Sequence, residues 1–258
     1  ILIGLVGSEM CIRDRFNINI LTLGITYKGI AFPLLFSLLD KRGNSNWEER
    51  KDIMERFFRL FGHDCTDCLV ADREFIGKEW IGWLNDNRIR YYIRIRQDVW
   101  VVKPSTGERI RAWWLFNSLK VGQEKFYNKL FLHKGQYVYL AGSRIKNSDG
   151  IPELQILLCF NRPEDGVETY KKRWEIETAF RAMKSSGFNI EDTHLRDRGR
   201  IARLFAIVCI AFVWAYLVGE HKDIYVKPIK ILKHGRRAKS LVKYGLVEIS
   251  NVLFRPTY

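Results

Sequence analysis

Between residues 17 and 96 the chain alternates between segments with strand periodicity and segments with helix periodicity. Asn17–Thr26 alternates polar and apolar residues, and Ile30–Leu39 follows it after the turn Tyr27-Lys28-Gly29. This pattern predicts a hairpin of two strands. Pro33 lies inside the second segment and predicts an edge strand or a bulge, because proline donates no backbone hydrogen bond.

Two helices and two further strands follow, in the order helix, strand, helix, strand: Trp47–Phe61, Cys68–Ala71, about Gly77–Asp86 and Arg90–Arg96. Ser45 or Asn46 is expected to cap the first helix, and Glu48 and Glu49 suit its first turn. The strand that ends at Ala71 is followed abruptly by the charged residues Asp72-Arg73-Glu74.

Residues 99–160 differ in character, since aromatic and β-branched residues alternate there with turn signals. We expect a β-rich insertion of antiparallel strands that ends in Glu153–Phe160. A helix is expected over Arg198–Val218, closed by Gly219, and residues 222–258 form a basic tail whose structure the sequence does not predict.

The chain is strongly basic, with 43 Lys and Arg against 29 Asp and Glu, a formal charge of +14 and a pI of about 9.6. The excess favours a polyanionic partner, either nucleic acid or an anionic membrane. Cations cluster at residues 170–184, 194–203 and 227–243, which argues against the alternative of a merely basic soluble protein. Disorder is excluded because 47% of the residues are hydrophobic.

The five cysteines are odd in number and scattered, so no disulfide framework is indicated and a reducing cytoplasm is expected. Cys65 and Cys68 form a CxxC pair near His63, but no second ligand pair has finger-like spacing. Two ordinary thiols are the favoured interpretation, and a zinc site is the alternative.

Leu204–Val218 is an uninterrupted run of 15 apolar residues. A membrane span needs about 20 such residues, so a buried core helix is expected and a membrane segment is the alternative.

A helix-length segment after the insertion carries polar side chains at a spacing that places them on one face. Tyr170, Arg173, Glu177 and Lys184 fall within an arc of about 60° at roughly 100° per residue. Ile176, Ala179, Phe180 and Met183 occupy the adjoining arc and are expected to pack inward. An aromatic hydroxyl, two cations and a carboxylate on one stripe suggest an enzyme that acts on phosphates.

Asp72 and Glu177 are the candidate catalytic and metal-binding carboxylates. Asp72 lies where a buried strand ends, which is where open α/β sheets bind ligands. The alternatives are a solvated loop aspartate and, for Glu177, half of a salt-bridge ladder with Arg173 and Arg181. Carboxylates that converge on a sheet edge bind paired Mg²⁺ ions, and two such ions stabilise the attacking and leaving oxygens of a phosphoryl displacement.

The motif Y-x2-R-x3-E-x6-K, formed by Tyr170, Arg173, Glu177 and Lys184, resembles the signature of IS4-type transposases. VADREFIGKEW is similar to the family's segment around the second catalytic aspartate, here Asp72, and the resemblance runs from about residue 16 to residue 217. It implies an α/β fold: an RNase H-like core, a mixed sheet flanked by helices, with a β-rich insertion between that aspartate and the catalytic glutamate.

The same resemblance implies a function. Asp72 and Glu177 would belong to a DDE site that uses Mg²⁺, or Mn²⁺ in its place, to cut DNA at insertion-sequence ends and join it to a target. Tyr170, Arg173 and Lys184 would contact DNA near the cleaved end. The expected partner is DNA, bound by a homodimer in the cytoplasm without a membrane.

The first fifteen residues depart from the family. GLVGSEMCIRDR resembles a translated sequencing-adapter read-through, so Ile1–Arg15 is expected to be non-native; a genuine short strand over Ile1–Val6 is the alternative. Family members carry the first catalytic aspartate in a motif like D-R-T-N-W, which is absent here, and Asp14 is not assigned its role. A truncated catalytic domain that binds DNA but cleaves it poorly is therefore expected.

Five segments follow from these patterns: 1–15 non-native, 16–98 the first part of the core, 99–160 the insertion, 161–220 the second part with the glutamate helix, and 221–258 a basic C-terminal segment. Two other functions stay open, a different RNase H-like nuclease such as a junction resolvase and a DNA-binding remnant without chemistry. Trp113 and Trp114 are candidates for stacking a base flipped out of the duplex, although most tryptophans belong to the core.

Overall fold

The computed structural model describes residues 3–13, 17–41, 43–147, 149–185, 187–193, 195, 197–233 and 235–254. The chain divides into two compact units, residues 1–10 with 19–177 and residues 11–18 with 178–258. The division falls inside one helix, directly after Glu177. The five segments predicted from the sequence follow other boundaries and stay predictions.

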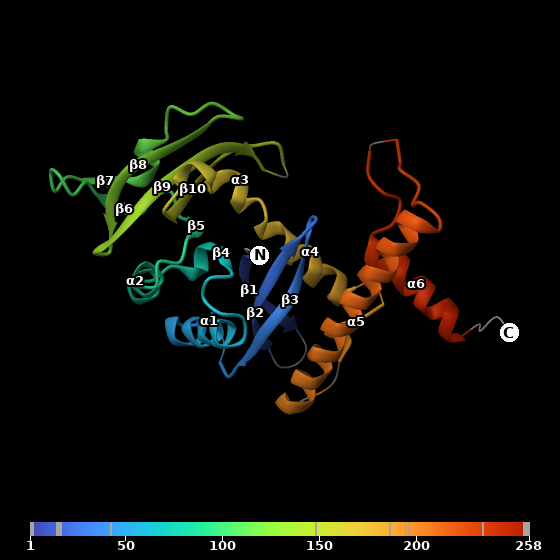
Figure 1. Ribbon diagram of the computed structural model, residues 1–258. Coiled ribbons are helices and arrows are strands. Elements are labelled where there is room, and N and C mark those ends of the chain that lie inside the picture. The colour runs from blue at the N-terminus through green and yellow to red at the C-terminus, as the bar shows by residue number, and fades with distance from the viewer. Residues whose placement is uncertain are drawn as a thin grey trace. The chain divides into compact units, whose positions relative to one another are not determined.

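One mixed sheet of ten strands organises the first unit (Figure 1). Its order is β3-β2-β1-β4-β5-β10-β9-β8-β6-β7. Strands β1, β4 and β5 are parallel, whereas the pairs β2–β3, β5–β10, β10–β9, β9–β8, β8–β6 and β6–β7 are antiparallel. The strands are β1 Ile3–Arg13, β2 Asn17–Tyr27, β3 Ile30–Leu39, β4 Thr66–Ala71, β5 Tyr91–Ile95, β6 Trp100–Val102, β7 Arg109–Arg111, β8 Glu124–His133, β9 Gln136–Lys146 and β10 Pro152–Phe160.

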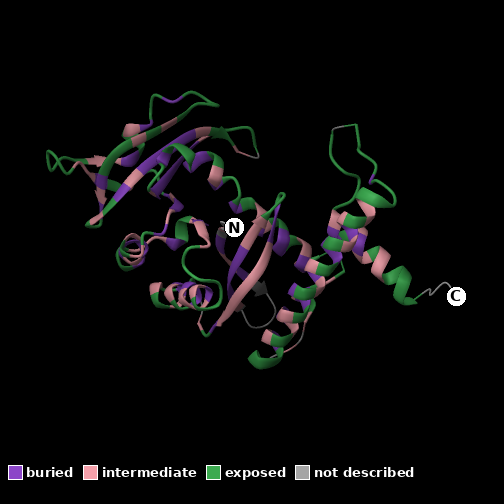
Figure 2. Cartoon of the chain, viewed as in Figure 1, coloured by how far each residue is buried: buried purple, intermediate pink, exposed green. Residues whose placement is uncertain are grey.

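Helices flank both faces of this sheet. Helices α1 (Trp47–Phe61) and α2 (Lys78–Asp86) bury Phe57 and Trp80 in one core cluster with strand residues such as Leu69. Helix α3 (Gly166–Tyr170) packs on β4, β5, β9 and β10. Figure 2 shows the buried residues along the central strands and the inward sides of these helices. The predicted fold, a mixed α/β sheet of the RNase H-like class with a β-rich insertion, is confirmed.

Local sequence signals explain where several elements begin and pair. The side chain of Asn46 accepts a hydrogen bond from the Glu49 amide, and the Glu49 carboxylate accepts one from the Asn46 amide, so a capping box starts α1. Pro33 lies in β3, which is an edge strand, and the pairing with β2 shifts beside it, between Leu23 and Gly24. Both alternatives raised by Pro33, an edge and a bulge, are confirmed.

The insertion continues the core sheet. Strand β10 pairs antiparallel with β5 between Ile156↔Ile95 and Phe160↔Tyr91, and β9, β8, β6 and β7 follow outward. Several antiparallel strands ending in a strand over about 153–160 were predicted correctly. Their position as an extension of the core sheet was not predicted, because it depends on the long-range pairing of β10 with β5, which sequence periodicity does not reveal.

Strand β1 is the third of the ten strands, between β2 and β4, and it is parallel to β4 from Ile3↔Thr66 to Gly7↔Ala71. The sequence alternative, a short strand over Ile1–Val6, is correct in type but wrong in its limits, since β1 runs over Ile3–Arg13. The expectation that residues 1–15 are non-native stays a prediction, and Asp14 lies outside the described residues.

Two helix predictions are wrong in their limits. The segment after the insertion is not one helix, because α3 ends at Tyr170 and α4 (Arg173–Lys184) begins after a turn at 171–172. Helix α5 runs over Arg198–Tyr225 and passes through Gly219, the expected end. The tail contains another helix, α6 (Leu241–Phe254). Short 3-10 helices complete the described elements: η1 Arg73–Phe75, η2 Ala112–Leu115, η3 Pro163–Asp165 and η4 Ile190–Asp192.

Helices α5 and α6 pack against each other in the second unit. Helix α5 is long and apolar enough to cross a membrane by length and composition, with a mean hydropathy of 2.3 over its most apolar window. A single such helix is weak evidence for a membrane protein, because the core helix of a soluble protein meets the same criterion. Its buried residues include Phe205 and Phe212.

Candidate active site

Asp72 lies where β4 leaves the sheet. Strand β4 ends at Ala71, and the Asp72 carboxylate accepts a hydrogen bond from the Arg73 amide at 2.6 Å, which caps η1. The side chain of Asp72 is 40% exposed, so it is open to a ligand. The position at the carboxyl end of a parallel strand is the one predicted from the sequence.

Arg173 joins Asp72 to Glu177. Its Nη1 donates to Glu177 Oε1 at 2.5 Å and lies 3.6 Å from Asp72 Oδ2. The Arg173 side chain is only 8% exposed, whereas that of Glu177 is 33% exposed. Burial lowers the pKa of Arg173, but the hydrogen bond that it donates to Glu177 and the charges of Asp72 and Glu177 outweigh burial and raise the pKa. A permanently charged guanidinium therefore holds the two candidate carboxylates together.

Tyr170 lies beneath this cluster and is buried to 2% exposure. The Arg173 guanidinium carbon lies 5.8 Å from the centre of its ring. Burial raises the pKa of Tyr170 well above its ordinary value, so the phenol stays protonated. Within the described part of the chain, the Tyr170 hydroxyl and Arg173 Nε have no hydrogen-bond partner. Two buried polar atoms thus lie next to the carboxylates without satisfying contacts.

The structure brings together four of the five predicted site residues. Asp72, Tyr170, Arg173 and Glu177 all belong to the first unit. Lys184 belongs to the second unit, where its ammonium lies 2.7 Å from the carboxylate of Glu191. The turn at 171–172 means that the expected stripe is not a face of one helix.

The first turns of α4 are fixed on the β2–β3 hairpin. The carboxylate of Glu175 accepts a hydrogen bond from the Tyr27 amide at 3.1 Å. Ile176 packs where Gly24 leaves room, since a Cβ at Gly24 would lie 3.3 Å from the Ile176 Cδ1 atom. Ile176, Ala179, Phe180 and Met183 are all buried, as their spacing predicted. This packing sets the direction in which Arg173 and Glu177 project.

Ser8 follows the last β1 residue that pairs with β4, as Asp72 follows the last residue of β4. The parallel register of Val6↔Val70 and Gly7↔Ala71 makes Ser8 and Asp72 the next residues at the same level. A carboxylate at this level of β1 would be the nearest strand neighbour of Asp72, but the chain carries a hydroxyl there. Sequence reasoning missed Ser8, because only the register between β1 and β4 identifies it.

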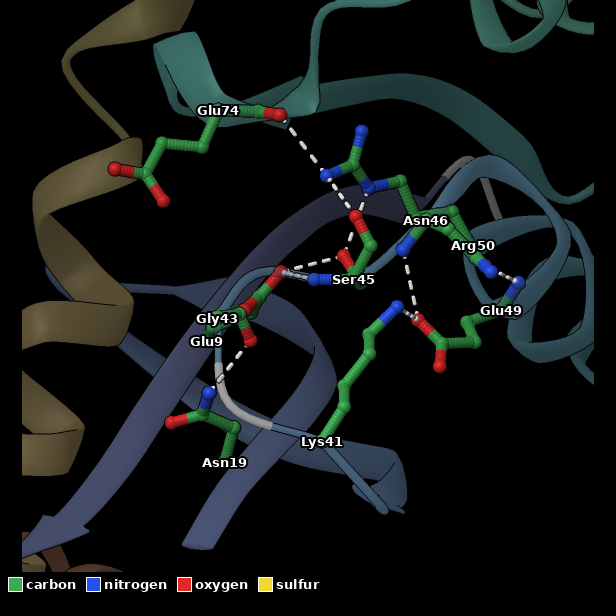
Figure 3. Close-up of polar contacts among 9 residues, drawn as sticks. All are labelled: Glu9, Asn19, Lys41, Gly43, Ser45, Asn46, Glu49, Arg50 and Glu74. Carbon is green, nitrogen blue, oxygen red and sulfur yellow. Dashed lines mark hydrogen bonds and ion pairs between the residues drawn. The ribbon is translucent and has the colours of Figure 1, made fainter. Parts of the chain in front are cut away.

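A buried arginine supports the turn that carries Asp72. Arg50 of α1 is 4% exposed, and it donates to the Ser45 hydroxyl at 2.8 Å and to the Glu74 carbonyl at 2.9 Å (Figure 3). The Ser45 amide and hydroxyl in turn donate to the carboxylate of Glu9 on β1. The network connects β1, α1 and the segment that follows Asp72. Nothing in the sequence spacing distinguishes Arg50 from the other cations of α1.

The donor types suit a divalent cation, since Asp72 and Glu177 offer carboxylate oxygens. Among the described residues, however, no group of three His, Cys, Asp or Glu side chains is close enough to hold a metal. The same result bears on Cys65 and Cys68, which form no such group with His63. The Cys65 thiol lies 2.8 Å from the Phe61 carbonyl instead.

Trp113 and Trp114 lie in η2 of the insertion and are 37% and 59% exposed. Their rings are 5.5 Å apart and tilted by 54°. Both indoles are accessible, and their role as base-stacking residues stays a prediction.

Comparison with known families gives one match. The family model described as "Transposase DDE domain" matches residues 50–214, which is more than half of the chain. The matched range contains Asp72, the insertion, Arg173 and Glu177. No curated protein matches the chain.

Proposed function

The chain belongs to the transposase DDE domain family, and we propose that Asp72 and Glu177 are two of the carboxylates with which it cuts and joins DNA. The observation that carries this proposal is the convergence of these carboxylates on one buried guanidinium, Arg173, although they lie 105 residues apart (177 − 72). Their side chains stay partly exposed, as a site for a macromolecular substrate requires.

The proposed reaction is an in-line displacement at phosphorus. In cleavage, a water oxygen attacks a phosphodiester, the bond to the 3′ oxygen breaks, and the water proton passes to solvent or to the leaving oxygen. In joining, the freed 3′ hydroxyl displaces an oxygen of the target strand in the same way. Mg²⁺ or Mn²⁺ held by Asp72 and Glu177 would supply Lewis-acid stabilisation of these oxygens.

The protein residues would contribute positioning and charge. Arg173 presents a planar fork suited to two phosphate oxygens, and Lys184 acts as a point charge. We propose that both contact the DNA backbone. Tyr170 is predicted as a third DNA contact, and its burial favours a role in which it positions the guanidinium of Arg173.

The position of Ser8 on β1 is where a third carboxylate would lie next to Asp72. A third carboxylate beside Asp72 would complete a three-acid site, and Ser8 occupies that level of β1. We therefore propose that the chain binds DNA but cleaves it poorly. The alternative function, a DNA-binding remnant without chemistry, rests on Ser8 and on Arg173, whose single positive charge cancels one of the two charges of Asp72 and Glu177.

Nicking of a supercoiled plasmid with Mg²⁺ or Mn²⁺ tests the proposal. The expected order is little nicking by the wild type, a clear gain in Ser8→Asp, and loss of that gain when Asp72→Asn or Glu177→Gln is added. Ser8→Asn is the matched control, because it has the size of aspartate without its charge. Nicking that survives both Asp72→Asn and Glu177→Gln contradicts the assignment, and no gain in Ser8→Asp favours the remnant.

We also propose the subfamily to which the chain belongs and the DNA on which it acts. The motif of Tyr170, Arg173, Glu177 and Lys184 supports an IS4-type element, with cleavage and transfer at insertion-sequence ends by two copies of the chain in the cytoplasm. A junction resolvase is the other nuclease considered, and preference for four-way junctions over transposon ends would identify it.

A further inference from the structure

A basic pocket lies at the far end of the insertion, formed by strands that the catalytic assignment does not use. It has a volume of about 720 Å³. Its walls come from the segment after β5, from β6 and β7, and from the turn between β8 and β9: Arg96, Asp98, Val99, Trp100, Val102, Arg109, Leu132, His133, Lys134 and Gly135.

The charge of the lining is unbalanced. Arg96, Arg109 and Lys134 contribute three cations, and Asp98 is the one acid among the lining residues. Within the described chain these three cations form no ion pair, whereas nearby Lys103 pairs with Glu108 at 2.7 Å. Unpaired like charges around one hollow repel each other, so an anion that enters it is stabilised.

The exposed Trp100 orders one of the three pocket cations, Arg109, together with the neighbouring Arg111. Trp100, Val102, Arg109 and Arg111 share one face of the β6–β7 ladder, because Trp100 pairs with Arg111 and Val102 with Arg109. The guanidinium carbons of Arg111 and Arg109 lie 4.1 and 5.1 Å from the indole centre. Arg111 also donates to the Asp98 carbonyl. The guanidiniums are thus held on the aromatic face rather than moving freely in solvent.

One buried polar atom in the lining has no partner. His133 is 4% exposed and lines the pocket. Its Nδ1 lies 3.4 Å from the Trp100 carbonyl, and its Nε2 has no hydrogen-bond partner among the described residues. Burial lowers the pKa of His133, so the ring is neutral at pH 7 and adds no charge. Because Nδ1 carries the hydrogen that faces the Trp100 carbonyl, Nε2 is an acceptor, and the cations rather than His133 are the groups that suit an anion.

The lining matches the chemistry of a DNA backbone. Val99, Val102 and Leu132 provide apolar surface between the cations, which suits deoxyribose, and the cations suit phosphates. Arg109 and Arg111 already occupy the Trp100 ring, which argues against a base stacked on it. We propose that this pocket binds the sugar–phosphate backbone of DNA, independently of sequence, as a second contact apart from Asp72 and Glu177. The inference rests on the proposed function in taking DNA as the ligand.

The test measures the salt dependence of DNA binding by the full chain in a Glu177→Gln background, so that cleavage does not interfere. The triple variant Arg96→Gln/Arg109→Gln/Lys134→Gln is expected to bind duplex DNA more weakly. Each lost phosphate contact lowers the slope of log K against log salt by about 0.9, so the triple variant loses up to about 2.7. Trp100→Leu keeps the charge and should weaken binding roughly two- to fivefold, the effect of losing a cation–π contact.

The control is Lys51→Gln/Arg59→Gln/Arg88→Gln, which removes the same charge outside the pocket and should keep the wild-type slope. Equal slopes for the pocket variant and this control overturn the inference and leave the catalytic proposal intact. If the chain with its native pocket binds no DNA, both the pocket proposal and the catalytic proposal are contradicted. Vesicles with anionic lipid form a second arm, and loss of vesicle binding without loss of DNA binding also overturns the proposal.

Discussion

Arg173 decides the electrostatics of the candidate site. Two carboxylates that face one solvent-accessible edge repel each other, and the guanidinium between them cancels one of their two charges. A divalent cation would compete with the guanidinium for the same oxygens. If Asp72 and Glu177 bind a metal ion as we propose, Arg173 must release at least part of its contacts when the ion binds.

Substitution of Arg173 tests this competition. Arg173→Gln leaves Asp72 and Glu177 without their shared cation, and we expect a loss of about 1–3 kcal/mol in the free energy of unfolding. The loss is smaller than for a fully buried pair because both carboxylates are partly exposed. Mg²⁺ should raise the melting temperature of this variant more than that of the wild type.

Arg94→Gln is the matched control, since it breaks another arginine–glutamate pair, with Glu153 across β5 and β10. It should cost about 0–1 kcal/mol and show no added response to Mg²⁺. An equal Mg²⁺ shift in wild type and Arg173→Gln would show that the guanidinium and the metal do not share ligands.

The buried hydroxyl of Tyr170 leads to a prediction about thermal stability. Its buried hydroxyl lacks a partner among the described residues, and an unsatisfied buried polar group costs about 1–3 kcal/mol. Tyr170→Phe should therefore unfold at the same temperature as the wild type or higher in the absence of DNA. Calorimetry checks this, and a loss above about 1 kcal/mol would mean that the hydroxyl is hydrogen-bonded in solution.

At the scale of elements, α5 and α6 cross at two glycines. A Cβ on Gly219 would lie 2.0 Å from the Leu241 carbonyl oxygen, and one on Gly245 would lie 1.8 Å from the Ala215 carbonyl oxygen. Both contacts are with backbone, which cannot rotate away. Gly219 is therefore a packing residue and not the end of a helix, which explains why α5 runs past the predicted limit.

Because the two helices cross closely at Gly219 and Gly245, adding one methyl group at either glycine should strongly destabilise the α5–α6 pair. Gly219→Ala or Gly245→Ala should destabilise the α5–α6 pair by about 1–3 kcal/mol or more, because the helices must separate. Gly199→Ala in the first turn of α5 meets only a side-chain oxygen at 3.3 Å and should be close to neutral. Thermal unfolding followed by circular dichroism distinguishes them, and three similar melting temperatures would refute the close crossing.

The limits of the strands and helices show which boundaries sequence periodicity can predict. Ile30–Leu39 and Trp47–Phe61 have the predicted limits, because alternation and capping residues act locally. The break at 171–172 was missed, since Lys171-Lys172 is fully compatible with a helix and only the packing of α3 and α4 separates them. Gly219 shows the reverse error, a local stop signal overridden by a partner helix.

At the scale of the whole molecule, the sequence identified Asp72 and Glu177 as a pair, and the fold brings both to Arg173. It did not identify Ser8 or Arg50, because their roles depend on the register of β1 with β4 and on a network across three segments. The basic pocket at Trp100 was also missed. Its three cations, Arg96, Arg109 and Lys134, come from three separate segments, so no run of charge marks it.

Mn²⁺ titration followed by electron paramagnetic resonance measures whether Asp72 and Glu177 together bind a metal ion, as we propose. Asp72→Asn and Glu177→Gln should each weaken Mn²⁺ binding about tenfold or more, the double variant should lose little beyond either single one, and Ser8→Asp should tighten it. Wild-type Mn²⁺ affinity in both single variants would contradict the account.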